Sequence, residues 1–435
     1  MNLLKKILFL FVIALSLWLR FYHYTNYPQR GATSDEYTYS FLGTSLLTKG
    51  VPISWSAFQA YKNREDLTID GIYFPIVRPY FDHPPLYAIT VGSFLLLFHQ
   101  TSFALQQLWT IRLVPIVLST VTSILLFFFA KRLYGFRVAI VSLLLYSTVT
   151  IFVMNQRVSV AENQVALFFV LGLYLYQRWQ KKLTKKRIVI LGIVAGLACI
   201  TKIMGIALFI SFFFLLIQQR IVWRKIGVFT LVFVLSSSLL LLYAWHYDWQ
   251  LFWSIQSMQS GRNIGPESLL LLLLQPVIVN KVYFDGWYFL GLVALSFLTV
   301  DFKKHGMIIT PATIYFLCLI ASLTKEGQSG WYMIPEFAFM AIAISVFVVQ
   351  TLGTKSITFL LVPLLVGLSQ IQYLFEPIFG LSSVMYRLLL AVLFLPLLLL
   401  FLFKKDFLYR KVGYIYFFFF LVCTVILTHR YIHPS

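Results

Sequence analysis

The chain has 435 residues, of which 60% are hydrophobic, 18% aromatic and only 11% charged, and its mean hydropathy is +0.84. This composition excludes an ordinary soluble domain, and repeated apolar runs of about 17 to 25 residues predict membrane-spanning helices. The net charge of +20 would suggest nucleic acid in a soluble protein. Here Lys and Arg cluster between apolar runs, as the positive-inside rule describes. We therefore predict an all-α polytopic membrane protein whose partner is the lipid bilayer, with no nucleic acid.

The start of the chain resembles a signal peptide, because basic residues precede the apolar run Ile7 to Leu19. No small-residue cleavage site follows, so we expect an uncleaved first helix in the cytoplasmic (plasma) membrane, with its N-terminus on the inner, cytoplasmic side and the active site outside. Cys199, Cys318 and Cys423 lie within apolar runs without paired spacing, which predicts neither a disulfide framework nor a metal cluster.

The basic clusters are expected on the cytoplasmic side. Between two successive clusters the chain must cross the membrane and return, so each interval holds an even number of spans. This parity predicts about thirteen helices. The expected spans are residues 7–23, 111–130, 138–154, 164–178, 188–201, 203–219, 226–245, 287–301, 307–323, 333–350, 357–373, 388–403 and 412–428.

Two intervals are unusual. Residues 188–217 are too short for two full spans, so we expect a hairpin of two short helices that turns at Lys202. Residues 84–98 are apolar but have no partner span, and the pair Pro84-Pro85 predicts a short re-entrant or in-plane helix.

The acidic residues give an independent check of this topology, because it was built from the apolar runs and the basic clusters alone. Only Asp301 and Asp406 of the 15 Asp and Glu residues fall on the inner side, so acid-dependent work is expected on the outer face. The long outer loops, about 24–110 and 246–286, should form that face of a single domain over residues 1–435, with no separate soluble domain.

Short helices are expected in both outer loops. Ser34 can cap a helix that runs from Asp35 towards Gly50 along the membrane surface, and the leucine run Leu269 to Leu274 is too short to span.

Asp35 and Glu36 are the first candidates for chemistry. Acidic residues in the first turn of a helix also stabilise its positive dipole end by about 0.3 to 1 kcal/mol, which is a structural explanation for this pair. Their position after the first span, in a loop that holds most other acids, favours a general base that takes a proton from an acceptor.

Further candidates have structural explanations of their own. In the segment from Asp82-His83 to Tyr87, the prolines could simply start a helix, and Glu162 could simply cap one. Lys202 is harder to explain as structural, because a lysine at a helix centre in the membrane costs about 2.5 to 3.5 kcal/mol. Arg112 could contact a phosphate or extend to lipid headgroups.

The ordered set of these segments resembles GT-C glycosyltransferases, in the branch of protein O-mannosyltransferases and the lipid A aminoarabinose transferase (glycosyltransferase family 39-like). The resemblance covers about residues 1–350. It is carried by Asp35-Glu36, His83 to Tyr87, Arg112-Leu113 with Lys131 to Gly135, Arg157 to Glu162, Gly196 to Lys202, and Trp331 to Pro335.

The resemblance implies a GT-C fold of about thirteen helices with juxtamembrane helices in the first outer loop. It also implies an inverting hexosyl or pentosyl transferase that uses a polyprenyl- or dolichyl-phosphate-linked sugar on the external face. Asp35 matches the catalytic acidic position, Glu162 the second acidic position, Lys202 the Thr-Lys lysine, and Tyr332 the aromatic position before the late proline. His83 matches a position before Pro-Pro that varies within the family. Glu162 stands at a position where aspartate is commoner in the family.

These assignments give a coherent scheme. Asp35, helped by Glu36, would activate a protein, lipid or cell-envelope glycan acceptor, while Lys202, His83 and Arg112 hold the donor phosphate. Tyr332, Glu162 and Asp82 would contribute to substrate binding. Asp35, Glu36 and Glu162 could also hold a divalent cation, since hard cations favour carboxylate oxygens.

Two other functions stay open at this point. A transporter or flippase of a lipid-linked sugar would place polar groups near the midplane in paired repeats, whereas here the acids crowd one rim and no repeat is visible. An inactive scaffold would differ from an enzyme in whether donor lipid binds.

Overall fold

The structure, a computed structural model, describes residues 2–29, 31–69, 71–261, 265, 267–322 and 329–432. Asp70 and Glu326, two of the acids predicted on the outer side, lie outside these residues.

The described chain is mainly helical, which confirms the predicted all-α class. The helices in the apolar segments are α1 (Leu3–Phe21), α4 (Leu108–Tyr134), α5 (Phe136–Thr148), α6 (Thr150–Gln156), α7 (Glu162–Trp179), α8 (Lys185–Thr201), α9 (Ile206–Gln218), α10 (Trp223–Ser237), α11 (Leu239–Tyr247), α14 (Gly286–Leu298), α15 (Phe302–Ile320), α16 (Ile334–Thr354), α17 (Leu368–Gln370), α18 (Glu376–Phe379), α19 (Ser383–Leu402) and α20 (Asp406–Arg430). The outer segments hold α2 (Asp35–Lys49), α3 (Leu86–Leu97), α12 (Trp249–Ser260) and α13 (Glu267–Leu274).

Each predicted span coincides with helix in the structure. Among the described residues, seven helical segments are long and apolar enough to cross a membrane, or up to eight if α5 and α6, bent by 63° at their junction, form one span. The chain is therefore a multi-pass membrane protein, while the count of about thirteen crossings stays a prediction.

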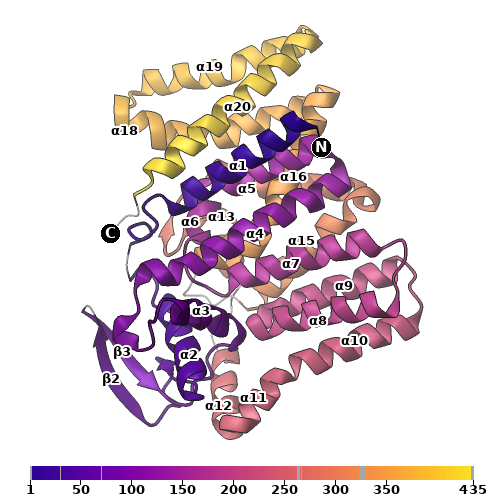
Figure 1. Cartoon of the computed structure of the whole chain (residues 1–435). Coiled ribbons are helices and arrows are strands. Elements are labelled where there is room, and N and C mark those ends of the chain that lie inside the picture. The colour runs from indigo at the N-terminus through magenta and orange to yellow at the C-terminus, as the bar shows by residue number, and fades with distance from the viewer. Residues whose placement is uncertain are drawn as a thin grey trace.

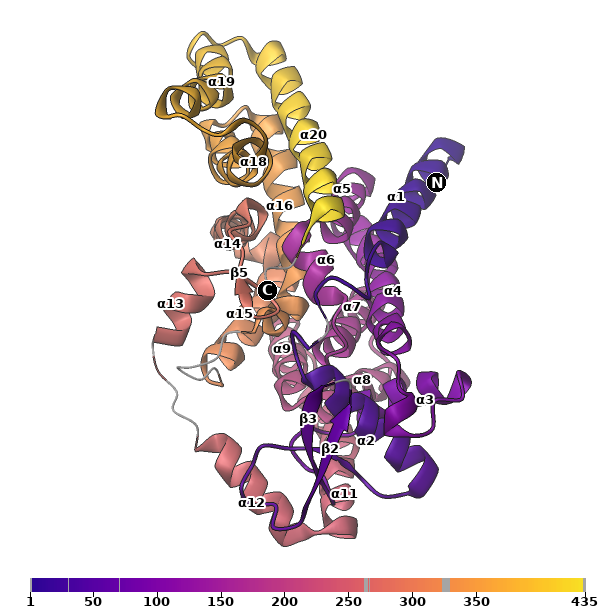
Figure 2. The same cartoon turned by 90° about the vertical axis from the view of Figure 1, so that its left-hand side faces the viewer.

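Helix α16 lies at the centre of the helical body. In the most apolar 18-residue stretch of the segment that contains α16, 89% of the residues are buried inside the protein, compared with 6% in α19. Helices α5, α7 and α14 pack against α16. Figures 1 and 2 show α19 and α20 at one end of the molecule, and Figure 1 shows α8, α9 and α10 in the opposite half. The exposed apolar surface of α19 is what a helix that faces lipid requires.

The hairpin predicted around Lys202 is present. Helix α8 ends at Thr201, Lys202 is extended (φ −155°, ψ 140°), and a short turn at Ile203–Gly205 leads into α9. The turn is so tight that a Cβ atom on Gly205 would lie 2.0 Å from the carbonyl oxygen of Ala198. The backbone thus fixes the position from which the Lys202 side chain projects.

The first outer segment folds into a small subdomain of helices and strands. Helix α2 packs against a three-stranded antiparallel sheet of order β1-β3-β2, and α3 packs against α2 (Figure 1). The strands are β1 (Ser54–Trp55), β2 (Arg64–Ile69) and β3 (Ile72–Val77), and a two-stranded pair, β4 (Val277–Ile278) and β5 (Lys281–Val282), lies in the second outer segment. Sequence analysis did not predict these strands, although Asp-Gly at 70–71 between apolar residues is a hairpin signal.

Helices α2 and α3 approach each other at two glycines. A Cβ atom on Gly43 would lie 1.9 Å from the carbonyl oxygen of Ala88, and one on Gly92 would lie 2.4 Å from the carbonyl carbon of Gly43. Only glycine permits this backbone contact. Because α2 begins at Asp35 and α3 follows His83, the contact sets the relative position of these two candidate residues.

The predicted bounds of α2 are confirmed, but its predicted cap is wrong. Helix α2 runs from Asp35 to Lys49, and Gly50 ends it in the left-handed conformation (φ 65°). The Ser34 side chain makes no capping hydrogen bond, because Ser34 already has helical dihedral angles. Thr33 takes that role one position earlier, since its hydroxyl accepts a hydrogen bond from the Asp35 amide at 3.1 Å.

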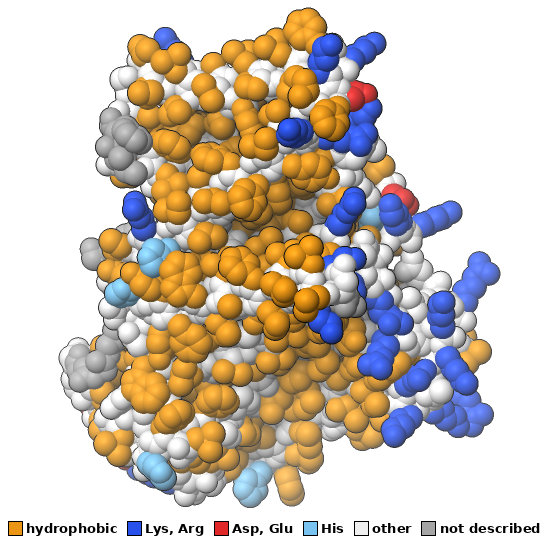
Figure 3. All heavy atoms as spheres, turned by 45° about the horizontal axis from the view of Figure 1, so that its top comes forward, with side chains coloured by type: hydrophobic (Ala, Val, Ile, Leu, Met, Phe, Trp, Pro, Cys, Tyr) orange, Lys and Arg blue, Asp and Glu red, His pale blue; other side chains and the backbone are white. Residues whose placement is uncertain are grey.

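Most Lys and Arg side chains in Figure 3 gather along one edge of the molecule, while apolar side chains cover much of the rest of the face. Exposed basic residues occur near the helix connections at Arg132, Arg137, Lys181, Lys182, Lys185, Lys186, Arg220, Arg224, Lys303, Lys304, Arg410 and Lys411. This clustering is the three-dimensional counterpart of the sequence pattern used to predict the cytoplasmic side.

Candidate active site

The candidate site forms where four separate segments meet. Asp35 is the first residue of α2, Glu162 is the first residue of α7, Lys202 separates α8 from α9, and Tyr332 lies just before α16. Electrostatic interactions of Lys202 extend to Glu162, Tyr332 and Asp35. The structure thus brings these four predicted residues together from distant parts of the chain.

Lys202 is held between an anion and an aromatic ring. Its ammonium nitrogen donates a hydrogen bond to Oε1 of Glu162 and lies 4.9 Å from the centroid of the Tyr332 ring. The Glu162 side chain is 1% exposed and that of Lys202 is 15% exposed. The pairing offsets the cost of placing a lysine at this depth, and part of the Lys202 side chain stays exposed.

Glu162 keeps unused hydrogen-bonding capacity. Within the described ranges, its second carboxylate oxygen, Oε2, has no hydrogen-bond partner although it is buried. The same holds for the side-chain carbonyl oxygens of the adjacent Asn163 and Gln164. Buried acceptors without donors are rare in native structures and call for an explanation. A bound group rich in hydroxyls would supply the missing donors.

Tyr39 of α2 is buried and interacts electrostatically with both Glu162 and Asp35. Burial of its hydroxyl raises the pKa of Tyr39 well above the usual value, and the negative charges of Glu162 and then Asp35 raise it further. Tyr39 therefore stays protonated and can donate a hydrogen bond. Sequence analysis missed this residue, although it lies four positions after Asp35 and hence on the same face of α2.

His83 joins this cluster through Tyr39. The two rings stack with centroids 5.2 Å apart and planes inclined by 25°. Tyr87, four positions after His83, packs edge-on against Tyr39 at 4.9 Å, and its hydroxyl lies 2.9 Å from that of Ser159. The His-Pro-Pro end of the outer segment is thus linked to the Asp35 end.

Asp82 accepts hydrogen bonds from three neighbouring side chains. Its carboxylate accepts hydrogen bonds from the hydroxyls of Ser56 at 2.6 Å and Tyr61 at 2.8 Å. Its backbone oxygen accepts one from the side-chain amide of Gln259 in α12 at 2.6 Å. These contacts tie the His83 turn to the sheet and to the second outer segment.

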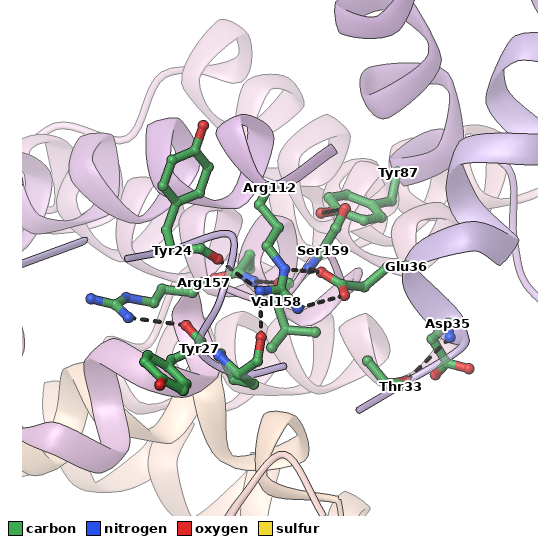
Figure 4. Close-up of polar contacts among 12 residues, drawn as sticks. Tyr24, Tyr27, Thr33, Asp35, Glu36, Tyr87, Arg112, Arg157, Val158 and Ser159 are labelled. Carbon is green, nitrogen blue, oxygen red and sulfur yellow. Dashed lines mark hydrogen bonds and ion pairs between the residues drawn. The ribbon is translucent and has the colours of Figure 1, made fainter. Parts of the chain in front are cut away.

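Glu36 and Arg112 form a buried ion pair with each other. Arg112 donates from Nε and Nη2 to the two carboxylate oxygens of Glu36, both at 2.9 Å, and both side chains are fully buried. The Ser159 amide donates to the same carboxylate at 3.0 Å. Figure 4 shows Glu36 directed toward Arg112 and Ser159, with the Asp35 side chain apart from this pair.

The carboxylates considered for a divalent cation do not assemble. Within the described ranges, no group of three or more His, Cys, Asp and Glu side chains is arranged to hold a metal ion. Glu36 is occupied by Arg112 and Glu162 by Lys202. Asp35, Glu36 and Glu162 therefore do not fit a shared cation in this arrangement.

Tyr315 of α15 is a second residue that sequence analysis missed. Its hydroxyl donates to the backbone oxygen of Tyr332 at 2.9 Å. This bond fixes the turn Gly330–Met333, which carries the Tyr332 ring toward Lys202. No sequence spacing connects a tyrosine inside an apolar helix with a turn that follows it, so only the fold shows this contact.

Comparison with known proteins agrees with the resemblance in the sequence. Residues 82–245 match the family described as dolichyl-phosphate-mannose-protein mannosyltransferase. No curated protein sequence matches the chain.

Solved structures share the fold at low sequence identity. One is ArnT from Cupriavidus metallidurans bound to undecaprenyl phosphate, with 14% identity, a TM-score of 0.53, and coverage of 99% of this chain and 78% of that one. Another is the oligosaccharyltransferase AglB from Archaeoglobus fulgidus in complex with an inhibitory peptide and a dolichol-phosphate, with 12% identity, a TM-score of 0.50 and coverage of 95% of this chain. The present chain spans 56% of that oligosaccharyltransferase.

The segment that matches the mannosyltransferase family contains His83, Arg112, Glu162 and Lys202, and the shared fold extends over nearly the whole chain. Both findings confirm the resemblance predicted from the ordered motifs: the protein has the GT-C fold and resembles the branch of that class that includes protein O-mannosyltransferases and ArnT.

Proposed function

We propose that the protein is an inverting glycosyltransferase that moves a hexosyl or pentosyl group from a polyprenyl- or dolichyl-phosphate donor to an acceptor hydroxyl or amine. The observation that carries this proposal is the Lys202–Glu162–Tyr332 cluster beside Asp35. A cation that can bind phosphate, beside a carboxylate that can take a proton, is the arrangement that transfer from a phosphate leaving group needs.

In this scheme Asp35 is the general base. The acceptor heteroatom attacks the anomeric carbon, and Asp35 takes the proton that the acceptor loses. The bond between that carbon and the phosphate oxygen breaks, and its electron pair leaves with the lipid phosphate. Asp35 suits the role because it is partly exposed at the start of α2, where a substrate can reach it.

Lys202 would bind the leaving phosphate. Its ammonium is already desolvated and oriented by Glu162 and Tyr332, so little reorganisation is needed when charge develops on the leaving oxygen. His83, held in place by Tyr39, would provide a further hydrogen bond. Oε2 of Glu162 would accept a hydrogen bond from a sugar hydroxyl.

Glu36 and Arg112 receive a different role from the one expected. Because they satisfy each other in the core, we propose that they position the start of α2 rather than contact substrate. Their ion pair, with the Ser159 amide bound to Glu36, joins α2 to α4 and to the loop before α7. Asp35 and Glu162 lie at the two ends of this connection. Asp82 would similarly hold the His83 turn in place.

We place the site on the external face, with the N-terminus inside. The edge of the molecule that carries the exposed basic residues is favoured as the cytoplasmic side by the positive-inside rule. Trp245, Trp249 and Trp253 are 75%, 42% and 48% exposed around the junction of α11 and α12. Exposed tryptophans are typical of a membrane interface, and α12 is bound to the His83 turn.

A transfer assay tests the proposed function. The full-length protein in vesicles would be given polyprenyl phosphates that carry radiolabelled sugars, with an envelope extract as acceptor. Transfer of label from lipid to acceptor, with release of polyprenyl phosphate, is expected for at least one donor. Movement of the labelled lipid between leaflets without cleavage would instead indicate a flippase and contradict the proposal.

A further inference from the structure

A second buried carboxylate lies outside the candidate site, in a cavity of its own. Glu336, in the first turn of α16, is 1% exposed, and neither of its carboxylate oxygens has a hydrogen-bond partner in the described part of the chain. It lines a cavity of about 220 Å³ bounded by α13, α14, α15 and α16.

The walls of the cavity are mainly apolar. They comprise Leu273, Leu292, Leu295, Ile309, Ala312, Phe316 and Met340. Ala312 and Met340 are buried, whereas Ser296, Thr299 and Thr313 are exposed. The cavity therefore has its floor at Glu336 and its mouth at the three hydroxyl side chains, between α14 and α15.

Two of the three hydroxyls at the mouth of the cavity donate their protons to the backbone. Ser296 donates its hydroxyl proton to the backbone oxygen of Leu292 at 3.0 Å, and Thr299 donates its own to that of Ser296 at 2.6 Å. Both hydroxyls thus present only lone pairs to the cavity. At the floor, Glu336 adds two further acceptor oxygens.

An occupant that fits must combine hydrogen-bond donors with an apolar body. A phosphate or carboxylate fits poorly, because it would meet the oxygen lone pairs of Ser296 and Thr299 and would oppose ionisation of Glu336. Water alone would satisfy Glu336 but not the apolar walls. A primary ammonium has three donors and a positive charge, and so complements a desolvated carboxylate.

We propose that this cavity is a binding subsite for a primary ammonium group carried on an uncharged, largely apolar body, with Glu336 as its counter-ion. Its mouth faces away from the buried core, so such a molecule would enter from the bilayer side. The subsite lies near the candidate active site, since Tyr315, which fixes the Tyr332 turn, is close enough to interact electrostatically with both Glu162 and Glu336.

Thermal unfolding of the full-length protein in phosphatidylcholine nanodiscs tests the subsite without any transfer assay. Dodecylamine should raise the unfolding midpoint by several degrees, whereas dodecanol, which has the same chain and no charge, should not. Glu336→Gln should abolish the response to dodecylamine. Glu376→Gln, at an exposed carboxylate in α18, is the matched control and should keep the response.

Two further arms complete the test. Ala312→Leu narrows the cavity while keeping Glu336, so it should also weaken the response, and it guards against a folding defect in the Gln variant. Nanodiscs with added phosphatidylethanolamine identify the source of the amine: a raised midpoint that depends on Glu336 indicates a lipid headgroup, and a response to dodecylamine alone indicates a substrate amine. Equal responses to dodecylamine and dodecanol, or a Glu336→Gln variant that responds like wild type, would overturn the proposal.

Discussion

The ammonium nitrogen of Lys202 lies 4.9 Å from the centroid of the Tyr332 ring, although a large part of the chain separates the two residues. This contact and the ion pair with Glu162 hold the cation ready for a phosphate. Lys202→Met should therefore lower kcat/KM for the lipid donor by about a hundredfold or more. Steady-state transfer from a labelled donor measures this change.

Lys202→Met also leaves Glu162 buried without its cation, which costs about 3 to 5 kcal/mol of stability. The double variant Glu162→Gln/Lys202→Met removes both charges, so it should regain most of the stability but not the activity. Lys62→Met, at an exposed lysine of the outer segment, is the control. A double variant that transfers sugar at the wild-type rate would show that Lys202 does not act on the donor.

The Glu36–Arg112 pair should contribute to stability rather than to chemistry. Glu36→Gln and Arg112→Met each break a fully buried ion pair and should each cost about 3 to 5 kcal/mol. The double variant should lose less than the sum, because neither charge is left alone. Chemical denaturation of the four proteins measures this coupling.

Activity per folded molecule separates the two roles of Glu36. We expect it to fall far less in Glu36→Gln than in variants of Asp35 or Lys202. A Glu36→Gln protein that unfolds like wild type but transfers no sugar would contradict the structural role and would support the catalytic role expected from the sequence.

The glycine contact between α2 and α3 should control both ends of the outer segment. Gly43→Ala places a methyl group 1.9 Å from the Ala88 carbonyl oxygen, so the helices must separate, at about 1 to 3 kcal/mol. Asp35 and His83 would then move apart. A lower unfolding midpoint and a lower kcat/KM are expected together.

Gly227→Ala in α10 is the matched control, because no atom lies within 4 Å of the added Cβ. It should leave stability and transfer close to wild type. If Gly43→Ala behaves in the same way, the close packing of α2 on α3 does not position the site.

Much of this architecture could be predicted from the sequence, because the membrane imposes simple rules. Apolar runs and basic clusters predicted the helical segments, and the polar pair at Thr201-Lys202 predicted the break between α8 and α9. The bounds of α2 followed from Asp35 and from Gly50, which takes the left-handed conformation. Local chemistry decides each of these features.

The contacts within the site could not be predicted in this way. Adjacent acids at Asp35 and Glu36 look equivalent in the sequence, yet successive helix positions point in different directions, and only the fold shows that Glu36 meets Arg112. The stacking of His83 on Tyr39 and the bond from Tyr315 to Tyr332 join distant segments. Such contacts depend on tertiary packing, which no periodicity encodes.

The central claim is that Asp35 takes the proton of the acceptor. Transfer from a labelled polyprenyl-phosphate sugar should be measured for wild type, for Asp35→Asn and for the control Asp66→Asn, whose carboxylate binds Tyr73 on the exposed hairpin. Loss of a general base predicts a fall of about 10² to 10⁴ in kcat for Asp35→Asn, with unchanged membrane insertion and donor binding. Asp66→Asn should retain its activity. An Asp35→Asn protein with the wild-type rate would contradict the account.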